Sequence, residues 1–180
     1  MGRFMNHKKW VVALALIATA LILTHLPVSE ADAAASASDF QIEGSTLTKY
    51  RGSDERVTIP DTVEVVGESA FENNQKVQFV VVPKSVKRMD AYVFWGCDNL
   101  EEVVLGKGLT SVDEYAFSGC TGLKQITIPE NVQSIDAQAF AGCTNLTDIY
   151  IPDTVTSIAD DAFLNCDNVT IHADEGSVAE

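Results

Sequence analysis

The chain has 180 residues, of which 26 are acidic and 12 are basic, and its formal net charge at pH 7 is −14. A field of that sign repels nucleic acid and anionic lipid surfaces, which argues against both as partners, and it favours solubility or a cationic partner. The length suits one domain.

Residues 1–37 have the features of a secretory signal peptide. Arg3, Lys8 and Lys9 form a basic start, residues 10–23 are an uncharged apolar run, and small residues at 31–37 offer cleavage sites. The run is shorter than the ~20 residues of a membrane span. We therefore expect a cleaved signal and a secreted or extracellular, cell-surface protein, with an uncleaved N-terminal anchor as the alternative. The remaining chain has nine basic and 24 acidic residues, a net charge of −15.

Residues 38–56 indicate an N-terminal cap. Phe40, Ile42, Leu47 and Tyr50 are the apolar residues of this segment that face the repeats, and Gly-Ser pairs at 44–45 and 52–53 mark turns. A cap of this kind covers the open edge of a strand ladder, which would otherwise pair with another chain.

Residues 57–173 repeat at an offset of 23, and residues 174–180 form an acidic C-terminal tail. The five tandem copies contain no insertion; they begin at Val57, Val80, Val103, Ile126 and Ile149. A unit of this length cannot bury its apolar side alone and must stack on its neighbours. The repeat therefore predicts a solenoid.

Each copy predicts the same series of elements. Two apolar residues separated by one outward residue predict a short strand, which ends at a proline in every copy except the third, where Gly106 replaces it. A second short extended segment and one phenylalanine per copy follow. The five rings should form a continuous stack, in which Phe71 contributes less than Phe117 because an end copy can fray.

The repeated pattern IPxxVxxIxxxAFxxCxxL resembles the BspA-like leucine-rich repeats, a class found mostly in secreted and surface-attached bacterial proteins. The resemblance implies a mainly β repeat solenoid: a right-handed leucine-rich-repeat coil with short parallel strands, in which five 23-residue copies lie between N- and C-terminal caps. Asn74, in place of the cysteine of the other copies, is a second departure from the pattern.

Four cysteines, Cys97, Cys120, Cys143 and Cys166, occupy one position of successive copies. Stacked Cα atoms would lie about 5 Å apart, a distance that permits disulfides. Stacked side chains point the same way, however, so we expect buried thiols that act as small packing groups. One straight column does not converge on a metal ion.

No sequence motif indicates catalysis. The repeats contain a single histidine, His172, and no phosphate-binding loop, nucleophile elbow or zinc-binding helix pattern. The acidic residues recur at turns, which is typical of a solvated surface. We therefore predict that the protein is not an enzyme and has no catalytic, cofactor-binding or metal-binding residues.

The outward residues of the first strands are the candidate ligand-binding surface. We call this set the strand strip: Phe79, Val81, Glu102, Val104, Gln125, Thr127, Asp148 and Tyr150. Phe79, Val81 and Val104 are apolar where packing does not require it, although β-propensity alone also favours such residues. Trp95 is a second candidate; its alternative role is to cover neighbouring apolar surface.

The preferred function is a secreted or cell-surface binding and adhesion module. It would present a concave leucine-rich-repeat surface to a protein or glycan on a host or cell surface, and the resemblance supports this because some BspA-like members are adhesins. The alternative is a non-catalytic spacer or accessory domain of a larger surface protein. We expect a monomer.

Overall fold

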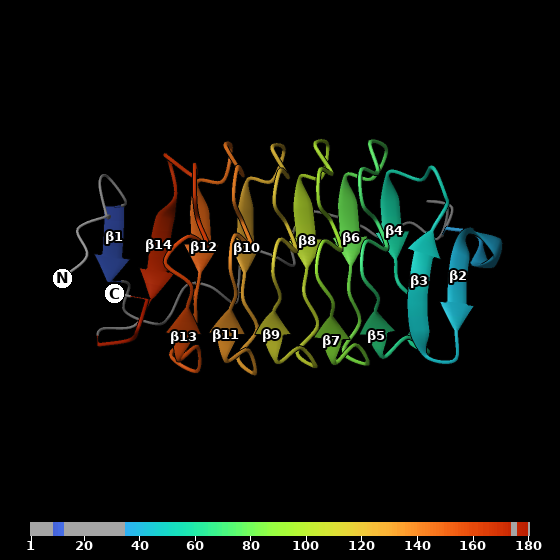
Figure 1. Ribbon diagram of the computed structural model, residues 1–180, viewed down its shortest axis with the longest axis horizontal. Coiled ribbons are helices and arrows are strands. Elements are labelled where there is room, and N and C mark those ends of the chain that lie inside the picture. The colour runs from blue at the N-terminus through green and yellow to red at the C-terminus, as the bar shows by residue number, and fades with distance from the viewer. Residues whose placement is uncertain (1–8, 13–34, 174–175, 180) are drawn as a thin grey trace, which may run out of the picture.

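The computed structural model describes residues 9–12, 35–173 and 176–179. The predicted signal peptide therefore lies largely outside the described residues. Figure 1 shows the described chain as a coil of short strands that form two rows along one rod.

The first row contains the strands that open each copy, together with a last strand near the C-terminus. They are β4 (Arg56–Thr58), β6 (Phe79–Val81), β8 (Glu102–Val104), β10 (Gln125–Thr127), β12 (Asp148–Tyr150) and β14 (Thr170–Ala173). The second row contains β5 (Val65–Val66), β7 (Arg88–Met89), β9 (Ser111–Val112), β11 (Ser134–Ile135) and β13 (Ser157–Ile158). All pairs within these two rows are parallel, which confirms the predicted solenoid.

The turn that carries the phenylalanines joins the copies on a third side. The Phe71 amide donates to the Val93 carbonyl at 2.9 Å, and the equivalent bonds of Phe94, Phe117 and Phe140 measure 2.8, 2.7 and 2.8 Å. The strand ladders are interrupted between β8 and β10 and between β7 and β9. The hydrogen bonds of the phenylalanine turns cross both of these copy boundaries, so the coil stays continuous there.

The core is an aromatic column surrounded by the aliphatic residues of the two strand rows. Phe71, Phe94, Phe117 and Phe140 are fully buried, and neighbouring ring centroids along the column lie 5.0 to 5.4 Å apart. These distances follow from the spacing of parallel strands, because each copy adds one ring at the same height.

The N-terminal cap extends this column. After the short 3-10 helix Ala37–Asp39, β2 (Phe40–Glu43) and β3 (Thr46–Tyr50) form an antiparallel hairpin, and β3 then pairs in parallel with β5. Tyr50 stacks on Phe71 at 5.0 Å and Phe40 packs on Tyr50 at 5.1 Å. Phe71 is therefore inside the column and not at its end, because the cap adds Tyr50 and Phe40 beyond it.

One further strand, β1 (Lys9–Val12), pairs in parallel with β14 at the opposite end of the rod from β2 (Figure 1). These four residues belong to the segment predicted to be a signal peptide. Removal of residues 1–37 would therefore expose the outer edge of β14.

Two turn positions of the repeat have the left-handed backbone conformation. One is occupied by Asn73, Gly96, Gly119, Gly142 and Asn165, the residue types that adopt positive φ most readily. The other is occupied by Ser69, Tyr92, Tyr115 and Gln138, at φ of 58°, 60°, 55° and 52°. A side chain in this region carries a steric cost, which the repeat geometry imposes at each of these four positions.

Candidate functional site

The strand strip forms two outward ladders on the first row of strands. The middle residue of each strand points inward, with Val80, Val103, Ile126 and Ile149 at most 4% exposed. The strip residues on either side are half-buried, except Gln125, which is exposed. The parallel register places Phe79 beside Glu102 and Val81 beside Val104. The strand pattern thus brings the predicted residues together on one surface.

At the N-terminal end of the strip, a cation covers an aromatic ring. The Arg56 guanidinium lies 4.3 Å from the centroid of the Phe79 ring, a distance at which the charge is attracted to the face of the ring. Arg56 was not among the predicted site residues. Arg56 is the first residue of β4 and pairs with Phe79 in the ladder, and its position 23 residues before Phe79 was the signal that could have identified it.

At the C-terminal end, three polar and aromatic side chains form a connected group. His172 Nε2 and Asp148 Oδ1 lie 2.8 Å apart, and the His172 ring stacks on Tyr150 with centroids 4.4 Å apart. The hydrogen bond to His172 lowers the pKa of Asp148. His172 was noted in the sequence without a site role. It joins the strip because the last copy is one residue shorter, which pairs His172 with Tyr150.

The middle of the strip is polar. Lys124 Nζ contacts Glu101 Oε2 at 2.5 Å, and these two residues line a shallow depression with Glu102 and Gln125. Both partners of this ion pair are more than half exposed, so the pair contributes little to stability. The strip therefore changes along the rod from apolar and cationic to acidic and aromatic.

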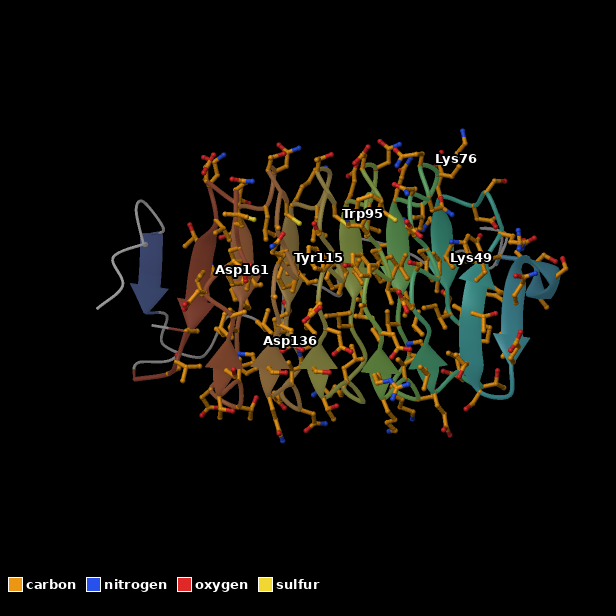
Figure 2. All side chains as sticks on the ribbon, in the orientation of Figure 1. Lys49, Lys76, Trp95, Tyr115, Asp136 and Asp161 are labelled. Carbon is orange, nitrogen blue, oxygen red and sulfur yellow. The ribbon has the colours of Figure 1, made fainter. Side chains whose placement is uncertain are left out.

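Trp95 does not lie on the strip. It is 38% exposed and belongs to the turn segment between β7 and β8. Tyr92 and Tyr115 are in the equivalent turns of two adjacent copies, and their rings stack with centroids 4.8 Å apart and planes 5° from parallel. Figure 2 labels Trp95 and Tyr115 near the middle of the rod. The two tyrosines were not predicted, although their shared column was visible in the sequence.

The cysteines are buried, as expected, and each satisfies a backbone group. Cys97, Cys120 and Cys143 donate to the carbonyls of Phe71, Phe94 and Phe117 at 3.0 to 3.1 Å, and Cys166 donates to Phe140 at 2.9 Å. Asn74 fills the same position differently. Its side-chain oxygen accepts from the amides of Lys76 and Val77 at 2.9 and 3.1 Å.

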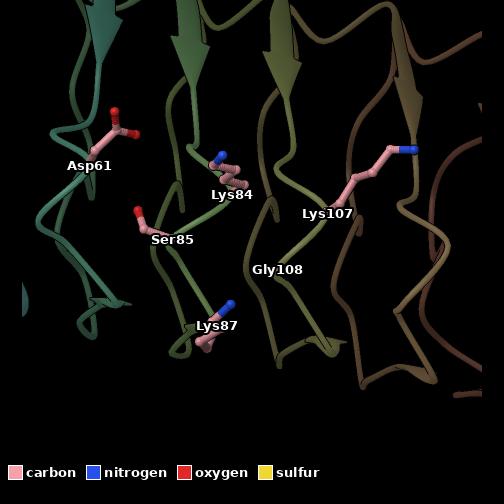
Figure 3. Close-up of a pocket in the computed structure, with 6 residues that line it drawn as sticks. All are labelled: Asp61, Lys84, Ser85, Lys87, Lys107 and Gly108. Carbon is pink, nitrogen blue, oxygen red and sulfur yellow. The ribbon is translucent and has the colours of Figure 1, made fainter.

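A second depression lies on the turns that follow the first strands. It is lined by Asp61, Lys84, Ser85, Lys87, Lys107 and Gly108 (Figure 3). These residues were not among the predicted site residues, because the prediction rested on the net charge of the whole chain.

Within residues 9–12, 35–173 and 176–179, no three or more His, Cys, Asp or Glu side chains are grouped so that they could hold a metal ion. The same described residues contain no helix that is long and apolar enough to cross a membrane.

A family model for the BspA type leucine rich repeat region matches residues 45–170 in six copies. We infer that the sixth copy, beyond the five found by the 23-residue offset, is the β3 segment, which pairs with β5 and adds Tyr50 to the aromatic column. The search of curated proteins found no match.

Several solved structures are similar. A leucine rich cell surface protein from Faecalibacterium prausnitzii is 34% identical, with a TM-score of 0.71 over 74% of this chain and 36% of that one. A leucine rich repeat protein of T. pallidum is 27% identical, with a TM-score of 0.73 over 77% and 71%. One from Bacteroides ovatus is 30% identical, with a TM-score of 0.63 over 71% and 36%. This chain thus covers 36% of the length of the Faecalibacterium prausnitzii protein and 36% of the length of the Bacteroides ovatus protein.

Proposed function

Because the chain belongs to the BspA-type leucine-rich repeat family, we propose that it is a non-catalytic binding and adhesion module that acts outside the cell. In this proposal residues 1–37 are a signal peptide, residues 38–56 cap the array, residues 57–173 form the monomeric scaffold, and residues 174–180 are a tail. The ligand is a protein or glycan on a host or cell surface, and it contacts the strand strip.

The observation that carries this proposal is the apolar group at the N-terminal half of the strip. Phe79, Val81 and Val104 lie on the outward face of β6 and β8 and are half-buried. They are absent from the buried core, which is complete without them. Apolar area that a ligand covers on this face would add roughly 25 cal/mol per Å² to binding.

The rigidity of the surface supports the same proposal. The strip residues sit on strands whose buried neighbours are fixed in the core, so little side-chain and backbone entropy is lost when a ligand binds. The cell-surface description of the Faecalibacterium prausnitzii protein is consistent with an extracellular location for this chain.

The test replaces the apolar group without touching the core. A Phe79→Ser, Val81→Ser, Val104→Ser variant should keep the thermal unfolding midpoint within a few degrees, because these side chains are outside the core. Partners captured from host-surface or envelope extracts by the unaltered protein would be purified and titrated against both proteins. The triple variant should lose saturable binding, and Trp95→Ser, on another part of the surface, should retain it.

If the triple variant binds the purified partner as tightly as the unaltered chain, the strip is not the site. An equal loss of binding in the Trp95→Ser variant would also reject the strand strip, and it would indicate a site on the turn surface that carries Trp95. Binding of a cationic partner should weaken as salt rises, because the net charge of −15 outside residues 1–37 would attract it at long range.

A spacer or accessory role is the second candidate. It is favoured by one observation, that the chain spans 36% of the length of the Faecalibacterium prausnitzii protein. A spacer would show no saturable binding as an isolated chain, whereas the adhesion module would.

A further inference from the structure

The turn after the first strand changes its charge in two adjacent copies. The residue that follows the proline position is acidic in three copies, Asp61, Glu130 and Asp153, and it is lysine in the second and third copies, Lys84 and Lys107. Lys87 lies three residues after Lys84 in the same turn. Three of the nine basic residues outside residues 1–37 therefore line one depression of a strongly acidic chain.

The geometry of this depression depends on two glycines of the third copy. A Cβ atom added at Gly106 would lie 2.3 Å from the Pro83 carbonyl oxygen, and one added at Gly108 would lie 2.3 Å from the Lys84 carbonyl oxygen. Any other residue would collide with the turn of the second copy. The copy that departs from the repeat pattern is thus the one whose turn backbone packs directly on the turn that carries Lys84.

The lysines are available to a ligand. Lys84 and Lys87 are exposed, and among the described residues neither has an ion pair within 4.0 Å. Lys107 Nζ lies 3.9 Å from Glu130 Oε2, with both side chains about 80% exposed. A pair at that distance and exposure is weak, so an external anion can compete with it.

The depression also contains an unsatisfied hydroxyl. Ser85 Oγ is buried and has no hydrogen-bond partner among the residues that the structure describes, and Figure 3 shows this side chain between Asp61 and Lys84. A buried hydroxyl without a partner destabilises the fold, because it has lost its hydrogen bonds to water. In the proposal below, this hydroxyl donates its unused hydrogen bond to a ligand oxygen.

We propose that Lys84, Lys87, Lys107 and Ser85 form a binding site for an anionic polysaccharide, separate from the strand strip. Lys84 and Lys107 repeat along the rod at about one strand spacing of 4.8 Å. A linear glycan that lies across the turns can place acidic groups, either sulfate or carboxylate, against these lysines.

The arrangement of charges around the depression favours a glycan whose acidic groups are widely spaced. Asp61 and Glu130 flank the two lysines along the rod, so a ligand with dense, continuous charge, such as nucleic acid or an anionic membrane, meets repulsion on both sides. The described lining residues are polar or glycine, with no apolar pocket for peptide side chains. Sugar hydroxyls between the acidic groups suit such a lining.

The test compares two variants with the same change in net charge. One is Lys84→Gln, Lys107→Gln, and the control is Lys76→Gln, Lys124→Gln, which alters exposed lysines elsewhere. Both would be titrated at low salt with a κ-carrageenan oligosaccharide, in which every second sugar is sulfated, a hyaluronan oligosaccharide, in which every second sugar carries a carboxylate, and a neutral maltooligosaccharide. We expect one or both acidic oligosaccharides to bind the unaltered protein and the neutral one not to bind. The Lys84→Gln, Lys107→Gln variant should bind the acidic oligosaccharide at least about tenfold more weakly. The control should stay within twofold.

The two acidic probes distinguish sulfate from carboxylate recognition. Failure of both to bind, equal weakening in the control, or equal or tighter binding of oligo-dT or polyglutamate would each overturn the proposal. The Phe79→Ser, Val81→Ser, Val104→Ser variant should bind the acidic oligosaccharide normally. This separates failure of the turn site from failure of the strand strip.

Discussion

The rings of Phe117 and Phe140 lie face to face, with centroids 5.2 Å apart and planes within 2° of parallel. Both are fully buried, and each has another phenylalanine of the column on its other side. The stack is set by the backbone: one strand spacing separates the rings, so neither can move toward a gap without breaking turn hydrogen bonds.

Phe117→Ala should therefore lower the free energy of unfolding by about 3–5 kcal/mol, because the neighbouring rings cannot close the cavity. Phe71→Ala should have a similar effect, since Phe71 lies between Tyr50 and Phe94. Chemical denaturation of both variants measures this. A much smaller effect at Phe71 would mean that the cap frays in solution.

The four thiols should be unreactive in the folded protein. Burial raises the pKa of Cys97 to about 12 and also raises that of Cys120; for Cys143 the contact with Cys166 is the main cause of the rise. Because the thiolate is the reactive form, a thiol reagent should label none of them rapidly at neutral pH and all four after denaturation. Labelling of two or fewer in denatured protein would show that adjacent copies are cross-linked.

The left-handed turn position offers a stabilising substitution. Gln138 has φ 52° and a half-buried side chain, so Gln138→Gly removes a steric cost and should raise the free energy of unfolding by up to about 1 kcal/mol. Ala137→Gly, one residue earlier, lacks this benefit and should lower it by about 0.4–1 kcal/mol. Thermal unfolding of the Gln138→Gly and Ala137→Gly variants measures both effects. Destabilisation by both substitutions would show that the left-handed conformation at Gln138 carries no steric cost.

Two aspartates should respond to pH in opposite ways. Burial, with the nearby charges of Asp136 and Asp90, raises the pKa of Asp113 despite the hydrogen bond from Ser111. Ionised Asp113 therefore opposes folding at neutral pH. Asp113→Asn should raise the unfolding midpoint at pH 7, and this gain should vanish as pH falls below the ordinary aspartate range of about 3.9.

Asp148 has the reverse sign, because the hydrogen bond to His172 lowers its pKa. Its contribution to stability is present above the ordinary aspartate range and is lost as pH falls through the lowered value. Asp148→Asn should thus lower the midpoint at pH 7 and have no effect at strongly acidic pH. Both changes should be small, because water partly screens these side chains. Parallel pH profiles for the two variants would contradict this account.

The fold was predictable because packing fixes the repeat. The phenylalanine column and the alternation around Val80 and Val103 follow from the requirement that each copy bury one face against the next. The sixth copy was missed because Tyr50 takes the place of a phenylalanine and its distance from Phe71 is 21 residues, so the offset of 23 does not align them.

The surface was less predictable for the same physical reason. Exposed residues are not constrained by packing, so their grouping depends on small changes in register. His172 joined Tyr150 through the shortened last copy. Lys84 and Lys107 of the turn depression are separated by 23 residues in sequence, and the net charge of −14 for the whole chain gives no sign of them. A column-by-column comparison of charge would have found both lysines.

The hydrogen bonds between copies run along the rod, from Phe71 to Val93 and onward to the last turn. A stretching force applied to the two ends of the array should therefore break these hydrogen bonds at one boundary between copies after another. Under tension the chain should lengthen in steps of roughly 80 Å, the extended length of one 23-residue copy. Such a module would limit the force between a surface and a bound partner, because one copy would unfold at a time while the others stay folded.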